Sequence, residues 1–84
     1  MKKKIEALFD LGNKMVQVKL IGMPLNGAWG TLQVGKLKNG TLVMLELNDD
    51  SKWQYAEGWK DFEDEESDEY QVLLSNGLSW NDVD

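Results

Sequence analysis

The stretch "KLKNGTLVMLEL", residues 36–47, carries the clearest local signal in the chain and decides the fold class. Asn39-Gly40 stands between alternating apolar residues, which predicts a two-residue type I′ hairpin turn with positive φ at both positions. The residues after this turn alternate in the way expected of a strand with one buried face. The residues that we expect to face the core are Val43, Leu45 and Leu47.

Further strands are indicated on both sides of this hairpin. Apolar and polar residues alternate over 16–20, "MPLNGAWG" at 23–30 is typical of a loop, and a strand begins within "WGTLQVG" at 29–35. "NDDS" at 48–51 predicts a turn, and Trp53 and Tyr55 share one side of the strand that follows it. Four short, closely spaced strands predict a mainly β fold, a small barrel or sandwich.

The two ends of the chain are less clearly β. Ile5, Leu8 and Phe9 recur at helical spacing, which predicts a short helix over residues 3–11 that stops at Gly12. Residues 70–83 fit two structures. One is a hairpin that turns at Asn76-Gly77, which the repeated Asn-Gly favours, and the other is a helix capped by Ser67 and stopped by Gly77.

The stretch from Val18 to Glu63 contains, in order, "VKLIGM", Pro24, "GAWGTL" at 27–32, and Phe62 between two acids. With these pieces, residues 16–63 resemble a small SH3-like, KOW-like barrel. In particular they are similar to a family of domains found in Firmicutes, their phages and their mobile elements. The family has no established activity to transfer. The 84 residues predict one domain: a helical lead-in (1–13), an SH3-like barrel (14–63), and an acidic segment with a terminal hairpin or short helix (64–84). The lead-in and the acidic end fall outside the resemblance.

The composition excludes several kinds of chemistry. The 84 residues include no cysteine and no histidine, so thiol nucleophiles, histidine-dependent triads and thiol–metal sites are impossible. We therefore expect a protein without enzymatic activity, metal or cofactor. The longest uninterrupted apolar run is only residues 42–45, and the basic start of the chain lacks an apolar signal region, so we expect a cytoplasmic protein without a membrane span.

The net charge of −6 is concentrated at one end of the chain. Residues 61–84 contain nine acids and no base, and seven of these acids lie within residues 61–69, here called the acidic segment. This segment is either a solvated tether or an ordered surface that mimics nucleic-acid phosphates. Trp59 precedes it, and Trp29 lies in a glycine-rich loop, so both are candidate interface residues. The predicted partner-binding residues are Trp29, Trp59, Asp61, Glu63, Asp64, Glu65, Glu66, Asp68 and Glu69.

These features suggest a leading hypothesis and several alternatives. The leading one is a phage- or mobile-element-encoded protein that binds the basic surface of a host enzyme and inhibits it. The main alternative is nucleic-acid binding by the barrel through four lysines, with the acidic end as autoinhibitor. A nucleotide-binding sponge, a homo-oligomer that stacks tryptophans, and a structural component are further alternatives. The lysines of the main alternative are Lys14, Lys19, Lys36 and Lys38.

Overall fold

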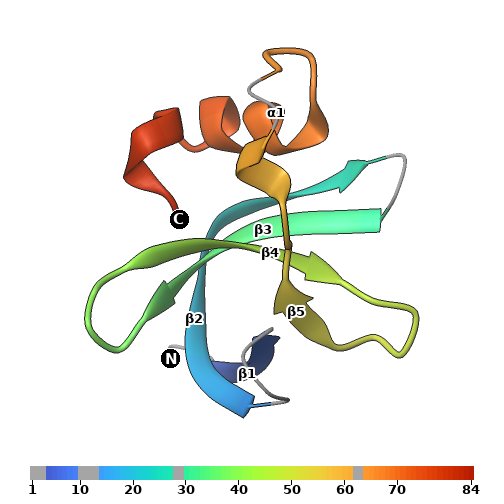
Figure 1. Cartoon of the computed structure of the whole chain (residues 1–84), viewed down its shortest axis with the longest axis vertical. Helices are drawn as coiled ribbons and strands as arrows, with labels where there is room; N and C mark the ends of the chain where they lie inside the picture. Colours follow the sequence, from blue (N-terminus) through green and yellow to red (C-terminus); the bar gives the residue numbers. More distant parts are fainter. Residues whose placement is uncertain (1–3, 10–13, 28–29, 62–63) are drawn as a thin grey trace.

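The computed structural model describes residues 4–9 and 14–16 by their backbone, and residues 17–27, 30–61 and 64–84 with their side chains (Figure 1). Five strands form a closed barrel, and three short helices follow them in the chain. The expected mainly β fold, a small barrel with a short helix, is confirmed. The strands are β1 (Lys4–Phe9), β2 (Lys14–Gly27), β3 (Gly30–Leu37), β4 (Leu42–Leu47) and β5 (Trp53–Tyr55). The helices are the 3₁₀-helix η1 (Trp59–Asp61), α1 (Asp68–Ser75) and the 3₁₀-helix η2 (Trp80–Asp82).

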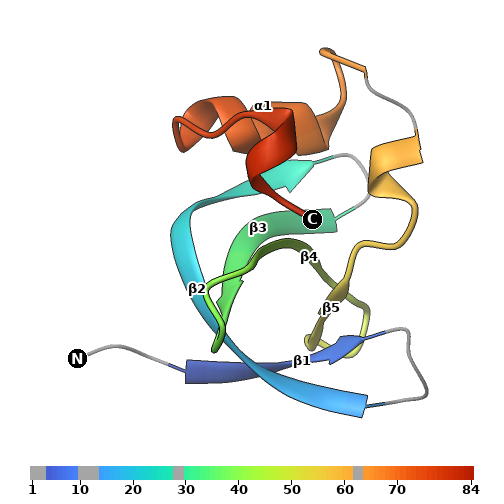
Figure 2. The same ribbon diagram turned by 60° about the vertical axis from the view of Figure 1, so that its left-hand side comes forward.

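The barrel closes through a parallel pair of strands. Each strand from β1 to β5 pairs antiparallel with the next one along the chain, so β1 and β5 run in the same direction. They close the barrel with Ala7 opposite Trp53 and Leu8 opposite Gln54. Figure 2 shows β1 crossing one end of the barrel beside β5.

The predicted N-terminal helix is wrong, because residues 4–9 form strand β1. All six residues of β1 pair with β2, from Lys4 opposite Lys19 to Phe9 opposite Lys14. A helix of this length is only marginally stable unless it packs against the rest of the protein. The strand instead gains hydrogen-bonding partners on both sides and completes the barrel, so tertiary pairing overrides the local spacing. The predicted stop at Gly12 lies outside the described residues.

The β3–β4 hairpin forms where expected, but with a different turn. Only Gly40 has positive φ (93°), so the turn is not type I′. The Gly40 N–H donates to the Leu37 carbonyl (2.9 Å), and the Leu37 N–H donates to the Thr41 carbonyl (2.8 Å). This pattern is a three-residue loop with glycine in the left-handed position. Of the residues expected to face the core, Val43 and Leu45 are buried and Leu47 is half-buried.

Strand β2 contains a bulge and continues past it to Gly27, so the loop predicted for residues 23–27 is wrong. The β2–β3 register shifts between Ile21 and Leu25, where Gly22 adopts φ 68°. The side chain of Gln33, the one buried polar residue described, donates to the carbonyls of Ile21 (3.3 Å) and Gly22 (3.0 Å). A neighbouring amide therefore satisfies carbonyls at the bulge.

Two apolar clusters lie on opposite sides of β4. Val43 and Leu45 pack with Val18 inside the barrel, where Trp53 also contacts the cluster. Met44 packs on the other side, in a cluster with β3, α1 and the residues after α1. The run "LVML" thus has both faces covered, as its uninterrupted apolar character allows. The second cluster joins α1 to the barrel, and Figure 2 shows α1 lying over one end of it.

The C-terminal element is a helix, so the favoured hairpin alternative is wrong and the helix alternative is confirmed. Ser67 caps the start of α1, because its hydroxyl accepts from the Tyr70 N–H (3.2 Å). At the other end, the Leu78 N–H donates to Leu73 (2.8 Å) and the Gly77 N–H donates to Leu74 (3.2 Å). These two bonds, with Gly77 at φ 69°, form a Schellman motif. Asn-Gly here ends a helix instead of turning a hairpin.

The last two residues extend the sheet. The Met44 N–H donates to the Asp84 carbonyl (3.1 Å), and the Asp84 N–H donates to the Leu42 carbonyl (2.8 Å). The preceding Val83 is fully buried in the cluster beneath α1. The polypeptide after the barrel is therefore fastened at both α1 and residue 84.

Candidate functional site

Residues 64–67 of the acidic segment form a hydrogen-bonded turn in front of α1. The Asp64 carboxylate accepts from the Glu66 N–H (2.9 Å), and the Asp64 carbonyl accepts from the Ser67 N–H (3.0 Å). The Gln71 side chain reaches back from α1 and donates to the Glu65 carbonyl (3.0 Å). With the Ser67 cap, these bonds connect every residue from 64 to 67 to a turn or to the helix. This part of the acidic segment is ordered by specific contacts, although it is dense in like charge.

Among the described acids of the segment, only Asp68 and Glu69 lie in the α-helix, which reduces the repulsion that the charge density would cause. Asp68 and Glu69 occupy the first turn of α1, where the helix dipole stabilises negative charge. Asp64 and Glu65 precede the helix, so repulsion between carboxylates four residues apart does not act within a helix. Asp61, in η1, is exposed. Glu63 lies outside the described residues.

Asp68 and Glu69 extend the negative charge from α1 onto the barrel. Together with Glu46 of β4, they line a small cavity of about 40 Å³. The Asp68 carboxylate lies where a Cβ on Gly27 would be, so α1 approaches the end of β2 closely. Glu46 is held in place by an accepted hydrogen bond from the Gln54 side chain (2.9 Å). We call the combined surface the acidic face; its residues are Glu46, Asp64, Glu65, Glu66, Asp68 and Glu69.

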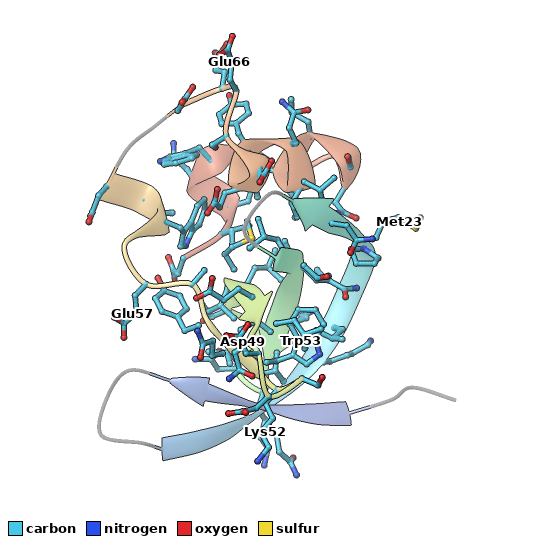
Figure 3. The ribbon with its side chains drawn as sticks, turned by 90° about the vertical axis from the view of Figure 1, so that its right-hand side faces the viewer. Met23, Asp49, Lys52, Trp53, Glu57 and Glu66 are labelled. Carbon is cyan, nitrogen blue, oxygen red and sulfur yellow. The ribbon has the colours of Figure 1, made fainter. Side chains whose placement is uncertain are left out.

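The exposed part of this face projects away from the barrel. Asp64, Glu65 and Glu66 are exposed, whereas Asp68 and Glu69 are half-buried. Figure 3 shows Glu66 projecting outward beyond α1, at the opposite end of the molecule from Lys52. The turn therefore presents three carboxylates to solvent, on a part of the chain that the α1 cap holds in shape.

Trp59, predicted from its position before the acids to be an interface residue, is instead part of the core. It is 7% exposed, and its indole N–H donates to the Asp84 carbonyl (3.1 Å). Its ring centroid lies 4.9 Å from that of Trp80, and the Lys60 ammonium lies 5.4 Å from the ring centroid of Trp59. The second candidate aromatic residue, Trp29, lies outside the described residues.

Two aromatic residues that the sequence analysis missed lie next to the acidic turn. Tyr70 follows the acidic segment directly, and its ring stacks on Trp80 with centroids 5.8 Å apart and an interplanar angle of 29°. Both side chains are half-buried, so each keeps some accessible surface. The helical alternative, with Ser67 as cap, already placed Tyr70 in the first turns of a helix. Trp80 could not be paired with it from the sequence.

The 3₁₀-helix η2 fixes the position of Trp80. The Ser79 N–H donates to the Asp82 carboxylate (2.9 Å), and the Asp82 N–H donates to the Ser79 carbonyl (3.0 Å). Hydrogen bonds from the backbone and the side chain of Ser79 lower the pKa of Asp82, because they stabilise its charged form. The bond from the Ser79 N–H to the Asp82 carboxylate therefore holds the turn that carries Trp80.

The lysines predicted for nucleic-acid binding are partly brought together. Lys19 of β2 and Lys36 of β3 are directly opposite each other, and both line a cavity of about 300 Å³ with Lys38. Lys14 pairs with Phe9 through the backbone, and its side chain lies outside the described part. Lys36 lies near the end of β3 and Lys38 in the loop that leads to β4, and Figures 1 and 2 show this hairpin well apart from α1.

Among the described residues, no group of three or more acidic side chains is placed so that it could hold a metal ion. No helix in this part of the chain combines the length and the apolar character needed to cross a bilayer.

Comparisons of the chain with protein-family models, with curated proteins and with solved structures found no match. The resemblance to domains of Firmicutes, phages and mobile elements therefore stays a prediction, and the geometry alone supports the proposal below.

Proposed function

We propose that this chain is a non-enzymatic acidic protein that binds and inhibits a basic host protein by mimicking nucleic-acid phosphates. The proposed target is a nucleic-acid-handling or defence enzyme, met in the cytoplasm of a host cell by a phage- or mobile-element-encoded inhibitor. One observation carries the proposal: the backbone that carries the carboxylates of residues 64–69 is held at the start of α1 by the Asp64 turn, the Ser67 cap and the Gln71 side chain. A solvated tether has no need of such bonds.

The charge density of this part of the segment suits phosphate mimicry. Residues 64–69 contain five carboxylates. Six residues span about 9 Å as a helix and about 20 Å when extended. The five charges are therefore spaced about 2–4 Å apart along the chain, and a turn that leads into a helix lies between these limits. Duplex DNA carries one charge per about 1.7 Å of its axis, so only a compact, ordered run approaches that density.

The aromatic residues beside the acids suit a protein partner. Tyr70 and Trp80 stack and keep accessible surface, which is the kind of rigid aromatic area that contributes most to protein interfaces. The Lys60 ammonium over the Trp59 ring illustrates how this cluster accommodates a cation. A lysine or arginine of the partner would contact Tyr70 or Trp80 in the same way, while its neighbours pair with the carboxylates.

The mechanism follows from charge complementarity. A site that holds nucleic acid presents lysines and arginines, and the acidic face would pair with them in place of phosphates. Long-range attraction would raise the association rate, so capture should weaken as salt increases. Inhibition would follow because the bound protein and the nucleic acid compete for the same cations.

The test distinguishes binding through the acidic face from an effect of net charge alone. Glu65→Gln/Glu66→Gln removes two exposed charges from the ordered turn, and Asp49→Asn/Asp50→Asn removes two exposed charges from the β4–β5 turn. Immobilised wild-type and variant proteins would capture basic proteins from a Firmicute lysate at about 50 and 200 mM salt. Duplex DNA would then be added as a competitor.

We expect wild-type protein and the Asp49/Asp50 variant to retain a basic partner at low salt and to lose it to duplex DNA. The Glu65/Glu66 variant should retain much less of it. Equal losses of captured protein in the two variants would show that capture depends on net charge alone. Undiminished capture by the Glu65/Glu66 variant would refute the proposed site.

A further inference from the structure

Leu74 is an exposed apolar residue next to the acidic face that the proposed function does not yet use. Among the described residues, two large hydrophobic side chains are exposed, Leu74 at 58% and Met23 at 67%. Leu74 lies on the outer side of α1, since Val72 and Leu73 are the residues of this helix that are buried against the barrel. A single exposed apolar side chain needs no explanation, so its neighbours decide whether it matters.

Leu74 continues an apolar stripe that begins at Tyr70. The two residues are four apart in α1, so their side chains are neighbours one helical turn from each other. Trp80 stacks on Tyr70 with ring centroids 5.8 Å apart, which widens the stripe beyond the helix. Tyr70 and Trp80 are half-buried, and Leu74 is exposed. We call these three residues the apolar stripe.

Acidic residues flank the apolar stripe on both sides along the chain. Glu66 precedes Tyr70 by four residues and projects beyond α1 in Figure 3. Asp82 is exposed in η2, two residues after Trp80. Residues 61–84 contain nine acids and no base. A molecule that covers the stripe must therefore bring positive charge to the edges of the contact.

We propose that the apolar stripe docks a segment of the basic partner in which an apolar side chain is flanked by lysines or arginines. This inference rests on the proposed function and adds that the partner's binding segment is amphipathic. The apolar side chain would cover Leu74 and the accessible edge of Tyr70, while the flanking cations pair with exposed Glu65 and Glu66. Protein interfaces commonly combine an apolar, aromatic centre with a polar rim in this way.

The charge of this surface favours such a partner over a second copy of the chain. Two-fold pairing of apolar stripes would bring two acidic turns towards each other. Like charges that meet at an interface are strongly unfavourable, and nothing basic in residues 61–84 would offset them. Nucleic acid is disfavoured as an occupant for the same reason, because its phosphates carry the same sign of charge.

The experiment compares two synthetic peptides of equal charge in NMR titrations of the full chain. One peptide is rich in lysine with leucines at helical spacing, and the other has serine at every leucine position. We expect the leucine peptide to bind about tenfold more tightly, because it covers a leucine-sized apolar surface. Its binding should shift the backbone amides of residues 64–66, 70, 74 and 80.

Three variants assign the binding energy to its sources. Leu74→Gln should remove most of the advantage of the leucine peptide. Met23→Gln makes a similar change at the other exposed side chain, which projects from β2 apart from Glu66 in Figure 3, and should leave the advantage intact. Glu65→Gln/Glu66→Gln should weaken the binding of both peptides. If Leu74→Gln does not fold, the comparison of the two peptides on wild-type protein still decides.

The outcomes separate this inference from the proposed function. Equal affinities for the two peptides, both weakened by Glu65→Gln/Glu66→Gln, would overturn the docking site and leave the proposed function standing. A leucine advantage that depends on Leu74 but not on the two glutamates would refute the proposed function and keep the apolar contact. An advantage lost equally in Met23→Gln would overturn the assignment to the stripe. Self-association of the free chain that Leu74→Gln abolishes would identify a second copy as the occupant and would also overturn the proposal.

Discussion

Replacing Ser67 by alanine tests the contact that joins the acidic turn to α1. The Ser67 hydroxyl accepts one hydrogen bond, from the Tyr70 N–H at 3.2 Å, and alanine leaves that donor without its cap. Removing such a cap typically costs about 1 kcal/mol. The eight-residue helix is too short to be stable by itself, so the loss should appear in the stability of the whole domain. In a domain of this size, about 1 kcal/mol lowers the thermal midpoint by about 4–8 °C.

The assay is urea unfolding followed by tryptophan fluorescence, with two control variants. Ser75→Ala makes the same chemical change at the exposed last residue of α1, and should alter the free energy of unfolding by less than about 0.5 kcal/mol. Ser67→Thr keeps a hydroxyl and should restore most of the lost stability. The reasoning is refuted if Ser67→Ala loses no more stability than Ser75→Ala.

Two other predictions concern the bulge and η2. In denaturant unfolding, Gly22→Ala should lower the free energy of unfolding clearly more than Gly77→Ala. Both residues have φ near 70°, but only at Gly22 would the new Cβ meet the Asn76 side chain. Similar losses of stability in the two variants would show that the Asn76 contact is unimportant. Folding lowers the pKa of Asp82 below 3.8. The stabilisation that the ionised Asp82 carboxylate gives the folded protein should therefore be complete above pH 3.8, and should disappear as the pH falls through the lower pKa of the folded state. Asp82→Asn should reduce the acid dependence of the unfolding midpoint, and an NMR titration that finds the Asp82 carboxyl at its usual pKa would contradict this.

The barrel strands were predictable because their signals are local. Alternation around Asn39-Gly40 and the Trp53–Tyr55 spacing each lie within one strand or hairpin. The N-terminal strand was not predictable in this way. The spacing of its apolar residues also suits a helix, and the choice depends on pairing with β2 and with β5, the latter more than 40 residues later in the chain. Distant pairing of this kind leaves no trace in a short window of sequence.

The two Asn-Gly pairs show how one dipeptide can serve two structures. Gly40 and Gly77 both adopt positive φ, one in a hairpin loop and the other at the end of a helix. The two pairs differ in the residues that precede them, because the Ser67 cap and the acids at the start of α1 come before Asn76-Gly77 only. Weighting those signals above the repeated dipeptide would have given the correct element.

The candidate site was predictable in its charge but not in its aromatic residues. The acidic segment is evident from composition, and part of it proves to be ordered. Trp59 was placed at the interface because it adjoins the acids, but it is buried beneath the residues after α1. Its burial and the stacking of Tyr70 on Trp80 both depend on how η2 folds back, which the sequence does not encode locally.

The central claim is that the backbone carrying the carboxylates of residues 64–69 is held in a defined shape, and ¹⁵N relaxation of the free protein tests it most directly. The account predicts order parameters for the Glu65, Glu66 and Ser67 amides close to those of α1, about 0.85. It also predicts slower exchange for the bonded Glu66 and Ser67 N–H groups than for exposed amides in the β4–β5 turn. Order parameters below about 0.6 throughout the turn would contradict the claim, and with it the proposed inhibitor.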